Sequence, residues 1–161
     1  KFIGEDRVVI PSPRVETYDK KPEMAAYEVA EILIENIKKN FYNLIVANFA
    51  NADMVGHSGN MKATIEAIQV VDSCVGKIYQ ECLRKDYTLI LTSDHGNADR
   101  MFDNNKSEVC TTHSVNPVPF IICDKVKFKS QIGCLADIAP TILKMMNISK
   151  PKEMSGSILI K

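Results

Sequence analysis

Short apolar runs that stop at turn residues recur along the chain. Four of them have the length of buried strands: residues 7–10, 44–49, 88–92 and 118–123. The runs at 44–49 and 88–92 are apolar on both faces, which is typical of strands covered on both sides. Pro117 and Pro119 move the start of the last strand toward a sheet edge or a bulge, because proline cannot donate to a ladder.

Apolar residues at helical spacing fill the intervals between these runs. They predict three helices, over residues 22–39, about 60–84 and 135–146. Alternating strands and helices predict an α/β fold, a mostly parallel, doubly wound sheet with helices on both faces. Residues 151–161 are expected to form a loop with a short strand.

A polar stretch from residue 97 to residue 112 separates the last two predicted strands. Residues 103–107 are its most mobile-looking part, because they are polar and rich in asparagine. We expect this loop to deliver His113 to the same end of the sheet as the other strand ends.

Composition narrows the class of protein. The 161 residues include 20 basic and 20 acidic side chains, so the formal net charge is zero, and no basic stripe indicates nucleic acid or a membrane surface. Five cysteines without a CxxC pair are typical of reduced thiols in a cytoplasmic protein. No apolar run approaches the roughly 20 residues of a membrane span. The chain starts without methionine and soon enters a strand-like run, which is typical of a fragment.

Carboxylates and imidazoles gather where predicted strands end. Asp94 and His95 follow one buried run, Asp53 and His57 follow another at a spacing of four, and His113 ends the polar loop. One such histidine alone would more often be a surface imidazole, but all three histidines of the chain occur in these loops. Mixed nitrogen and oxygen donors suit Mn²⁺ or Zn²⁺, and five donors exceed one tetrahedral site. The sequence therefore predicts two metal ions and phosphoryl transfer.

Six segments resemble a known family. They are residues 10–19, 21–24, 48–59, 92–99, 113–120 and 137–141. These segments look like the cofactor-independent (2,3-bisphosphoglycerate-independent) phosphoglycerate mutases of the alkaline phosphatase superfamily. The resemblance covers essentially the whole chain in order, but it corresponds to the carboxyl-terminal part of the family's sequence. It implies that residues 1–161 are the carboxyl-terminal portion of a metal-binding, phosphatase-like domain.

The resemblance also implies how the ligands divide between two metals. Asp53, His57 and His113 would hold the first, and Asp94 and His95 would form half of the shell of the second. Manganese is the expected ion, with Mg²⁺, Co²⁺ or Zn²⁺ as alternatives. In the family an amino-terminal aspartate and the nucleophilic serine complete the second shell, and an arginine-rich domain binds the substrate. The aspartate motif, the serine motif and the arginine-rich domain all lie outside the part of the family that this sequence resembles.

The implied activity belongs to the parent enzyme. A phosphoglycerate mutase is an isomerase of glycolysis that interconverts 3-phosphoglycerate and 2-phosphoglycerate through a phosphoserine. The expected partners are phosphoglycerate and the amino-terminal part of the enzyme, with no nucleic acid and no membrane. The chain alone contains no catalytic nucleophile and is expected to be inactive. Two alternatives stay open: another metal-dependent phosphohydrolase or phosphomutase of the superfamily, and a metal-binding module without catalysis.

Overall fold

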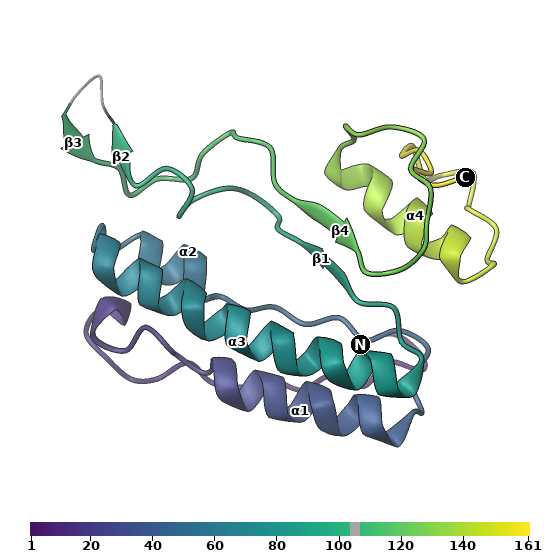
Figure 1. Cartoon of the computed structure of the whole chain (residues 1–161), viewed down its shortest axis with the longest axis horizontal. Helices are drawn as coiled ribbons and strands as arrows, with labels where there is room; N and C mark the ends of the chain where they lie inside the picture. The colour runs from purple at the N-terminus through teal and green to yellow at the C-terminus, as the bar shows by residue number, and fades with distance from the viewer. Residues whose placement is uncertain (104–106) are drawn as a thin grey trace.

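Two long helices form one layer of the molecule. The computed structural model describes residues 1–103 and 107–161, and in it α1 (Ala26–Lys39) and α3 (Met61–Lys85) lie side by side (Figure 1). The predicted helices over 22–39 and 60–84 are confirmed, although α1 begins four residues late. Among the described residues, no helix has both the length and the hydropathy to cross a bilayer.

The α1–α3 interface contains the larger apolar core. Ala30 and Ile37 of α1 pack with Cys74 and Ile78 of α3, all nearly inaccessible to solvent. Asn60 caps α3, because its side-chain oxygen accepts a hydrogen bond of 3.2 Å from the Ala63 amide. The packing of these two amphipathic faces gives α2 a rigid surface to rest on.

A short helix, α2 (Asn51–Gly56), lies across the start of α3 and is followed at once by His57. Val55 is 0% exposed and packs against Ala63 and Ala67 of α3. A helix of six residues is not stable by itself, so this packing decides where α2 sits. A 3-10 turn, η1 (Tyr18–Lys20), also contacts both helices.

The strands form two small antiparallel pairs. β1 (Ile90–Thr92) pairs with β4 (Phe120–Ile122), within two of the predicted strands. β2 (Phe102–Asp103) and β3 (Glu108–Val109) form a hairpin in the stretch that the sequence predicts as loop. Of the expected mobile segment 103–107, residues 104–106 lie outside the described residues.

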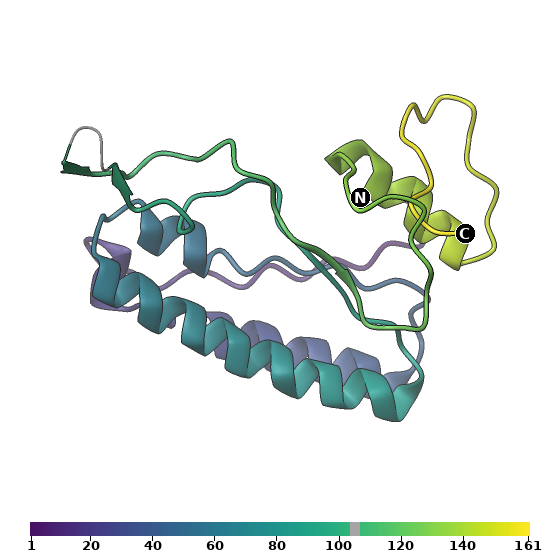
Figure 2. The same cartoon turned by 45° about the horizontal axis from the view of Figure 1, so that its top comes forward.

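The predicted mostly parallel, doubly wound sheet is not confirmed among the described residues. Residues 7–10 and 44–49 contain no assigned strand, and both ladders that are present run antiparallel. Val9 is 81% exposed and Val46 is 83% exposed, although their sequence pattern is that of a covered strand. Figure 2 shows residues 44–49 passing as a plain tube between the helical layer and β1. The backbone there has no neighbouring strand to pair with among the described residues.

A hollow of about 1540 Å³ lies beside this unpaired segment. Its lining includes Val46, Phe49, Leu89, Leu91 and Ile78. An apolar space next to an unpaired backbone is the kind of place that further strands fill.

The carboxyl-terminal region contains one further short helix. The predicted helix over 135–146 consists of a 3-10 turn, η2 (Leu135–Asp137), and α4 (Ile138–Met145). Asp137 accepts hydrogen bonds of 2.8 Å from the Cys134 amide and 2.7 Å from the Ser157 amide, which ties the tail to this helix. The short strand expected in the tail is only an isolated bridge at Ile160.

Candidate metal centre

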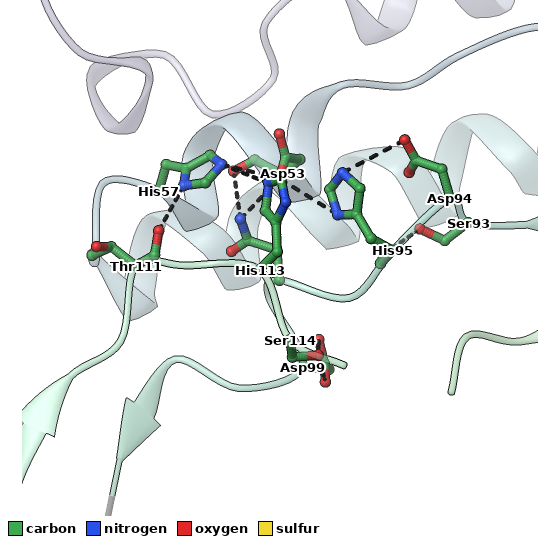
Figure 3. Close-up of polar contacts among 10 residues, drawn as sticks. Asp53, His57, Ser93, Asp94, His95, Asp99, Thr111, His113 and Ser114 are labelled. Atoms are coloured by element: carbon green, nitrogen blue, oxygen red, sulfur yellow. Dashed lines mark hydrogen bonds and ion pairs between the residues drawn. The ribbon is translucent and has the colours of Figure 1, made fainter. Parts of the chain in front are cut away.

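Three separate segments bring the five predicted ligands to one place (Figure 3). Asp53 lies on α2 and His57 directly follows it, since the spacing of four forms one helical turn as the sequence suggests. Asp94 and His95 lie in the loop after β1, and His113 lies in the loop after β3. Segments far apart in sequence thus meet beside α2.

Three ligand atoms form a nearly equilateral triangle. His57 Nε2 and His113 Nε2 each lie 3.2 Å from Asp53 Oδ1, and the two nitrogens are 3.1 Å apart. Ligand atoms about 2.1 Å from one metal are roughly 3.0–3.4 Å from each other in octahedral or tetrahedral geometry. The donor set Asp53, His57 and His113 therefore fits one divalent ion without rearrangement.

The protonation of His57 follows from its second ring nitrogen. His57 Nδ1 lies 2.6 Å from the carbonyl oxygen of Thr111, which can only accept a hydrogen bond. The proton of a neutral His57 is therefore on Nδ1, and the lone pair of Nε2 points into the triangle. Metal-binding histidines usually have such a hydrogen bond on the outer nitrogen.

His95 forms a second, looser group with the same partners. Its buried Nδ1 has no hydrogen-bond partner in the part of the chain that the structure describes, and it lies 4.0 Å from Asp53 Oδ1. Its ring stacks on His113 with centroids 3.7 Å apart, and ligand atoms of Asp53, His95 and His113 lie within 4.8 Å of one another. Asp94 Oδ2 is 3.5 Å from His95 Nε2. An unpartnered buried nitrogen beside a carboxylate suits a cation between them.

The loops that contain His95 and His113 are bound together, which the sequence did not reveal. Asp99 accepts hydrogen bonds from Ser114 Oγ at 2.9 and 3.1 Å and from Asn116 Nδ2 at 2.6 Å. The Ser114 amide donates to the Gly96 carbonyl at 2.8 Å. These hydrogen bonds, first that of Asn116, lower the pKa of Asp99 below its usual value. The cluster fixes the two histidines relative to each other.

Asn97 is a second residue of the site that no sequence pattern singles out. It is buried beside α2 and donates a hydrogen bond of 2.8 Å to Asp53 Oδ1. The available signal was its position, two residues after a candidate ligand and in a segment of the family resemblance.

Known proteins similar to this chain share its whole length. Residues 1–150 match the metalloenzyme superfamily. The 2,3-bisphosphoglycerate-independent phosphoglycerate mutase of Gracilaria tenuistipitata var. liui is 54% identical over 99% of this chain, and that of Ehrlichia canis (strain Jake) is 51% identical over 99%. Both alignments cover 32% of the relative, so the chain spans about a third of the length of these relatives.

The similarity extends to three dimensions. A crystal structure of Leishmania mexicana phosphoglycerate mutase, determined at low cobalt concentration, matches with a TM-score of 0.85 and 32% sequence identity. It covers 94% of this chain, while this chain covers 31% of it. The resemblance to cofactor-independent phosphoglycerate mutases and the α/β, alkaline-phosphatase-like fold class are thereby confirmed. The chain belongs to the metalloenzyme superfamily.

Proposed function

We propose that this chain is the carboxyl-terminal portion of the metal-binding domain of a phosphoglycerate mutase. The complete enzyme would interconvert 3-phosphoglycerate and 2-phosphoglycerate, as a glycolytic isomerase of the cytoplasm, through a phosphoserine. The observation behind this proposal is the triangle of Asp53, His57 and His113 in a chain about half identical, over its full length, to enzymes of that name. In the complete domain the sheet would be mostly parallel and doubly wound.

We assign Asp53, His57 and His113 to a first metal, and Asp94 and His95 to half of the shell of a second. A bound divalent ion would supply positive charge that stabilises a phosphoryl group and lowers the pKa of an attacking hydroxyl. Mn²⁺ suits two imidazoles and a carboxylate. Co²⁺ is a second choice, because the similar Leishmania enzyme was studied with cobalt.

The side chains of this chain have distinct tasks in that scheme. The Thr111 carbonyl orients the His57 ring and keeps the proton of its neutral form on Nδ1, so Nε2 is the nitrogen that would bind a cation. The carboxylate of Asp53 faces both histidine groups and supplies the negative charge between them. The stacking of His95 on His113 fixes the distance between the ligands proposed for the first metal and those proposed for the second.

The hollow supports a role for the remaining length of the enzyme. Asp53, Asp94 and His95 are among its lining residues, and His57 and His113 are not. The half-site that the resemblance leaves incomplete is thus the one that faces the hollow. We infer that the amino-terminal part of the enzyme fills this space with strands and brings the serine and the missing aspartate to Asp94 and His95.

The experiment is an assay of the native protein with 3-phosphoglycerate, in which formation of 2-phosphoglycerate is coupled to enolase. Activity should need no 2,3-bisphosphoglycerate, disappear with a chelator and return with Mn²⁺. Asp53→Ala should abolish it, whereas Asp124→Ala, which removes a carboxylate that is hydrogen-bonded to Thr88 and is none of the five proposed ligands, should not. Release of inorganic phosphate without isomerisation would indicate the phosphohydrolase alternative.

A further inference from the structure

Asn97 is a buried polar side chain that is hydrogen-bonded to a ligand of the proposed first metal site. Its exposed fraction is 6%, and its Nδ2 donates hydrogen bonds to Asp53 Oδ1 at 2.8 Å and, at the limit of 3.5 Å, to the Asp53 carbonyl. The amide has one sensible orientation, because turning it over would place its oxygen against two acceptors. Its own oxygen is buried without a hydrogen-bond partner among the described residues.

Gly56 is the reason that Asn97 can come so close to α2. A Cβ built on Gly56 would overlap Asn97 Oδ1 and lie 3.1 Å from its Cγ, while the next atom, the Ala98 amide nitrogen, is 3.7 Å away. Gly56 is the last residue of α2, and alanine is the better helix former. Space for the Asn97 amide, and not backbone freedom, explains a glycine at this position.

We propose that Asn97 is a positioning residue for the metal ligand Asp53, and that Gly56 leaves the space that the Asn97 amide occupies. This inference rests on the proposed metal site. The Asn97 N–H takes one acceptor direction of Asp53 Oδ1 and leaves the other directed toward His57 and His113, each 3.2 Å from the same oxygen. The amide that pins the carboxylate is itself pinned against Gly56, so the carboxylate keeps this orientation before any ion arrives.

Such support has a known scale. Removing a hydrogen-bond partner of a metal ligand typically weakens metal binding by about 10–100-fold, because the ligand must then be ordered at the moment of binding. Without the Asn97 hydrogen bond, the Asp53 carboxylate could turn away from His57 and His113 toward His95, whose Nδ1 lies 4.0 Å from the same oxygen. The absence of the donor should therefore be visible in metal affinity more than in folding.

The test compares two buried asparagines in the native protein. Asn97→Ala should raise the Mn²⁺ dissociation constant by about 10–100-fold, measured by calorimetry or by the loss of free Mn²⁺ signal in EPR. The matched control is Asn51→Ala, because Asn51 is 2% exposed, begins the same helix and donates to the Pro22 and Glu23 carbonyls, both at 2.9 Å, on the side away from the ligands. Asn51→Ala should lower the melting temperature of the metal-free protein and leave Mn²⁺ affinity within about threefold of wild type.

Two further readouts separate orientation from stability. The ligand-field spectrum of the Co²⁺-loaded protein should change in Asn97→Ala and stay as in wild type in Asn51→Ala. Gly56→Ala should weaken Mn²⁺ binding when Asn97 is present and have little effect in the Asn97→Ala background, because the atom it displaces is gone. In that background it should also raise the melting temperature, since alanine favours the helix.

Several outcomes would overturn the inference. Mn²⁺ affinity of Asn97→Ala within threefold of wild type would show that Asp53 needs no support from the amide. Equal weakening of Mn²⁺ binding by Asn51→Ala would show a general effect of instability. Equal effects of Gly56→Ala on Mn²⁺ binding in both backgrounds would show that Gly56 does not act by leaving space for the Asn97 amide. A wild-type protein that binds no Mn²⁺ would instead overturn the metal site itself, and with it this role of Asn97.

Discussion

Replacing Val55 with alanine tests whether the packing of α2 controls the metal site. Val55 lies between Asp53 and His57 in sequence, but its side chain is 0% exposed and packs against α3 in the cluster with Ala63 and Ala67. The substitution leaves both ligands and the Asn97 hydrogen bond in place. It removes only the apolar anchor by which a six-residue helix is held.

The magnitude follows from the lost methyl groups. Two buried methyl groups are worth about 1.6 kcal/mol in transfer free energy, and a residual cavity of roughly 50 Å³ adds about 1 kcal/mol if it does not collapse. The free energy of unfolding of the metal-free protein should therefore fall by about 2–3 kcal/mol. Because Asp53 and His57 both depend on α2, undocking of that helix raises the apparent Mn²⁺ dissociation constant by the reciprocal of the docked fraction.

The assay is denaturant unfolding of the metal-free protein together with Mn²⁺ titration at a fixed pH. Ile78→Val is the control, since it removes one methylene from the α1–α3 core at a cost of about 1 kcal/mol and is remote from α2. We expect weaker Mn²⁺ binding in Val55→Ala, by a few-fold to tenfold, and wild-type binding in Ile78→Val. A 2–3 kcal/mol loss of stability with unchanged affinity in Val55→Ala would refute the argument that this packing holds the ligands.

Four further outcomes are expected. His113→Ala should raise the Mn²⁺ dissociation constant by more than roughly 100-fold and His95→Ala by less, because His113 belongs to the tighter group. Equal losses of affinity in the two variants would contradict the assignment. Mn²⁺ binding to the wild-type protein should weaken in acid, since imidazoles release protons when they bind metal. Backbone hydrogen bonds from Cys134 and Ser157 lower the pKa of Asp137, so their stabilisation is present above the unfolded pKa of about 4 and is lost as the pH falls through the lower folded pKa. Asp137→Asn should therefore lower the melting temperature at pH 7 and have a smaller effect near pH 2. An equal effect at both pH values would show that the charge of Asp137 does not stabilise the fold. Gly156→Ala should also lower the melting temperature, because its Cβ would overlap the Ala136 carbonyl oxygen. In light scattering, the 161 residues alone should associate, because Val46 and its neighbours expose an unpaired apolar segment; a stable monomer would contradict this.

Local patterns in the sequence predict the helices well and the sheet poorly. The stripe of α3 and its cap at Asn60 depend on neighbours within one helical turn, so they are visible in sequence. Strand pairing depends on which segments meet in space, and the apolar run at 44–49 indicates a covered strand without saying what covers it. The hairpin β2–β3 was missed because its strands are two residues each and lie in a polar stretch.

The candidate site shows the same division between local and spatial information. The Asp53 and His57 spacing of four predicts one helical turn, and the structure has that turn. The hydrogen bond that His57 Nδ1 donates to the Thr111 carbonyl and the cluster around Asp99 depend on loops meeting across the molecule. A backbone carbonyl leaves no mark in sequence, so the fixed tautomer of His57 could only come from coordinates.

The triangle has a mechanical consequence, because its corners belong to two different parts of the molecule. His57 follows α2 on the helical layer, whereas His113 lies 56 residues further along, in a loop bound to the strands. An ion held by both would be a cross-link that closes this length of chain, and for a loop of that size the chain-entropy estimate is about 4 kcal/mol. Withdrawing the ion would remove this cross-link between α2 and the loop after β3, so hydrogen exchange of β2 and β3 would report metal occupancy from outside the site.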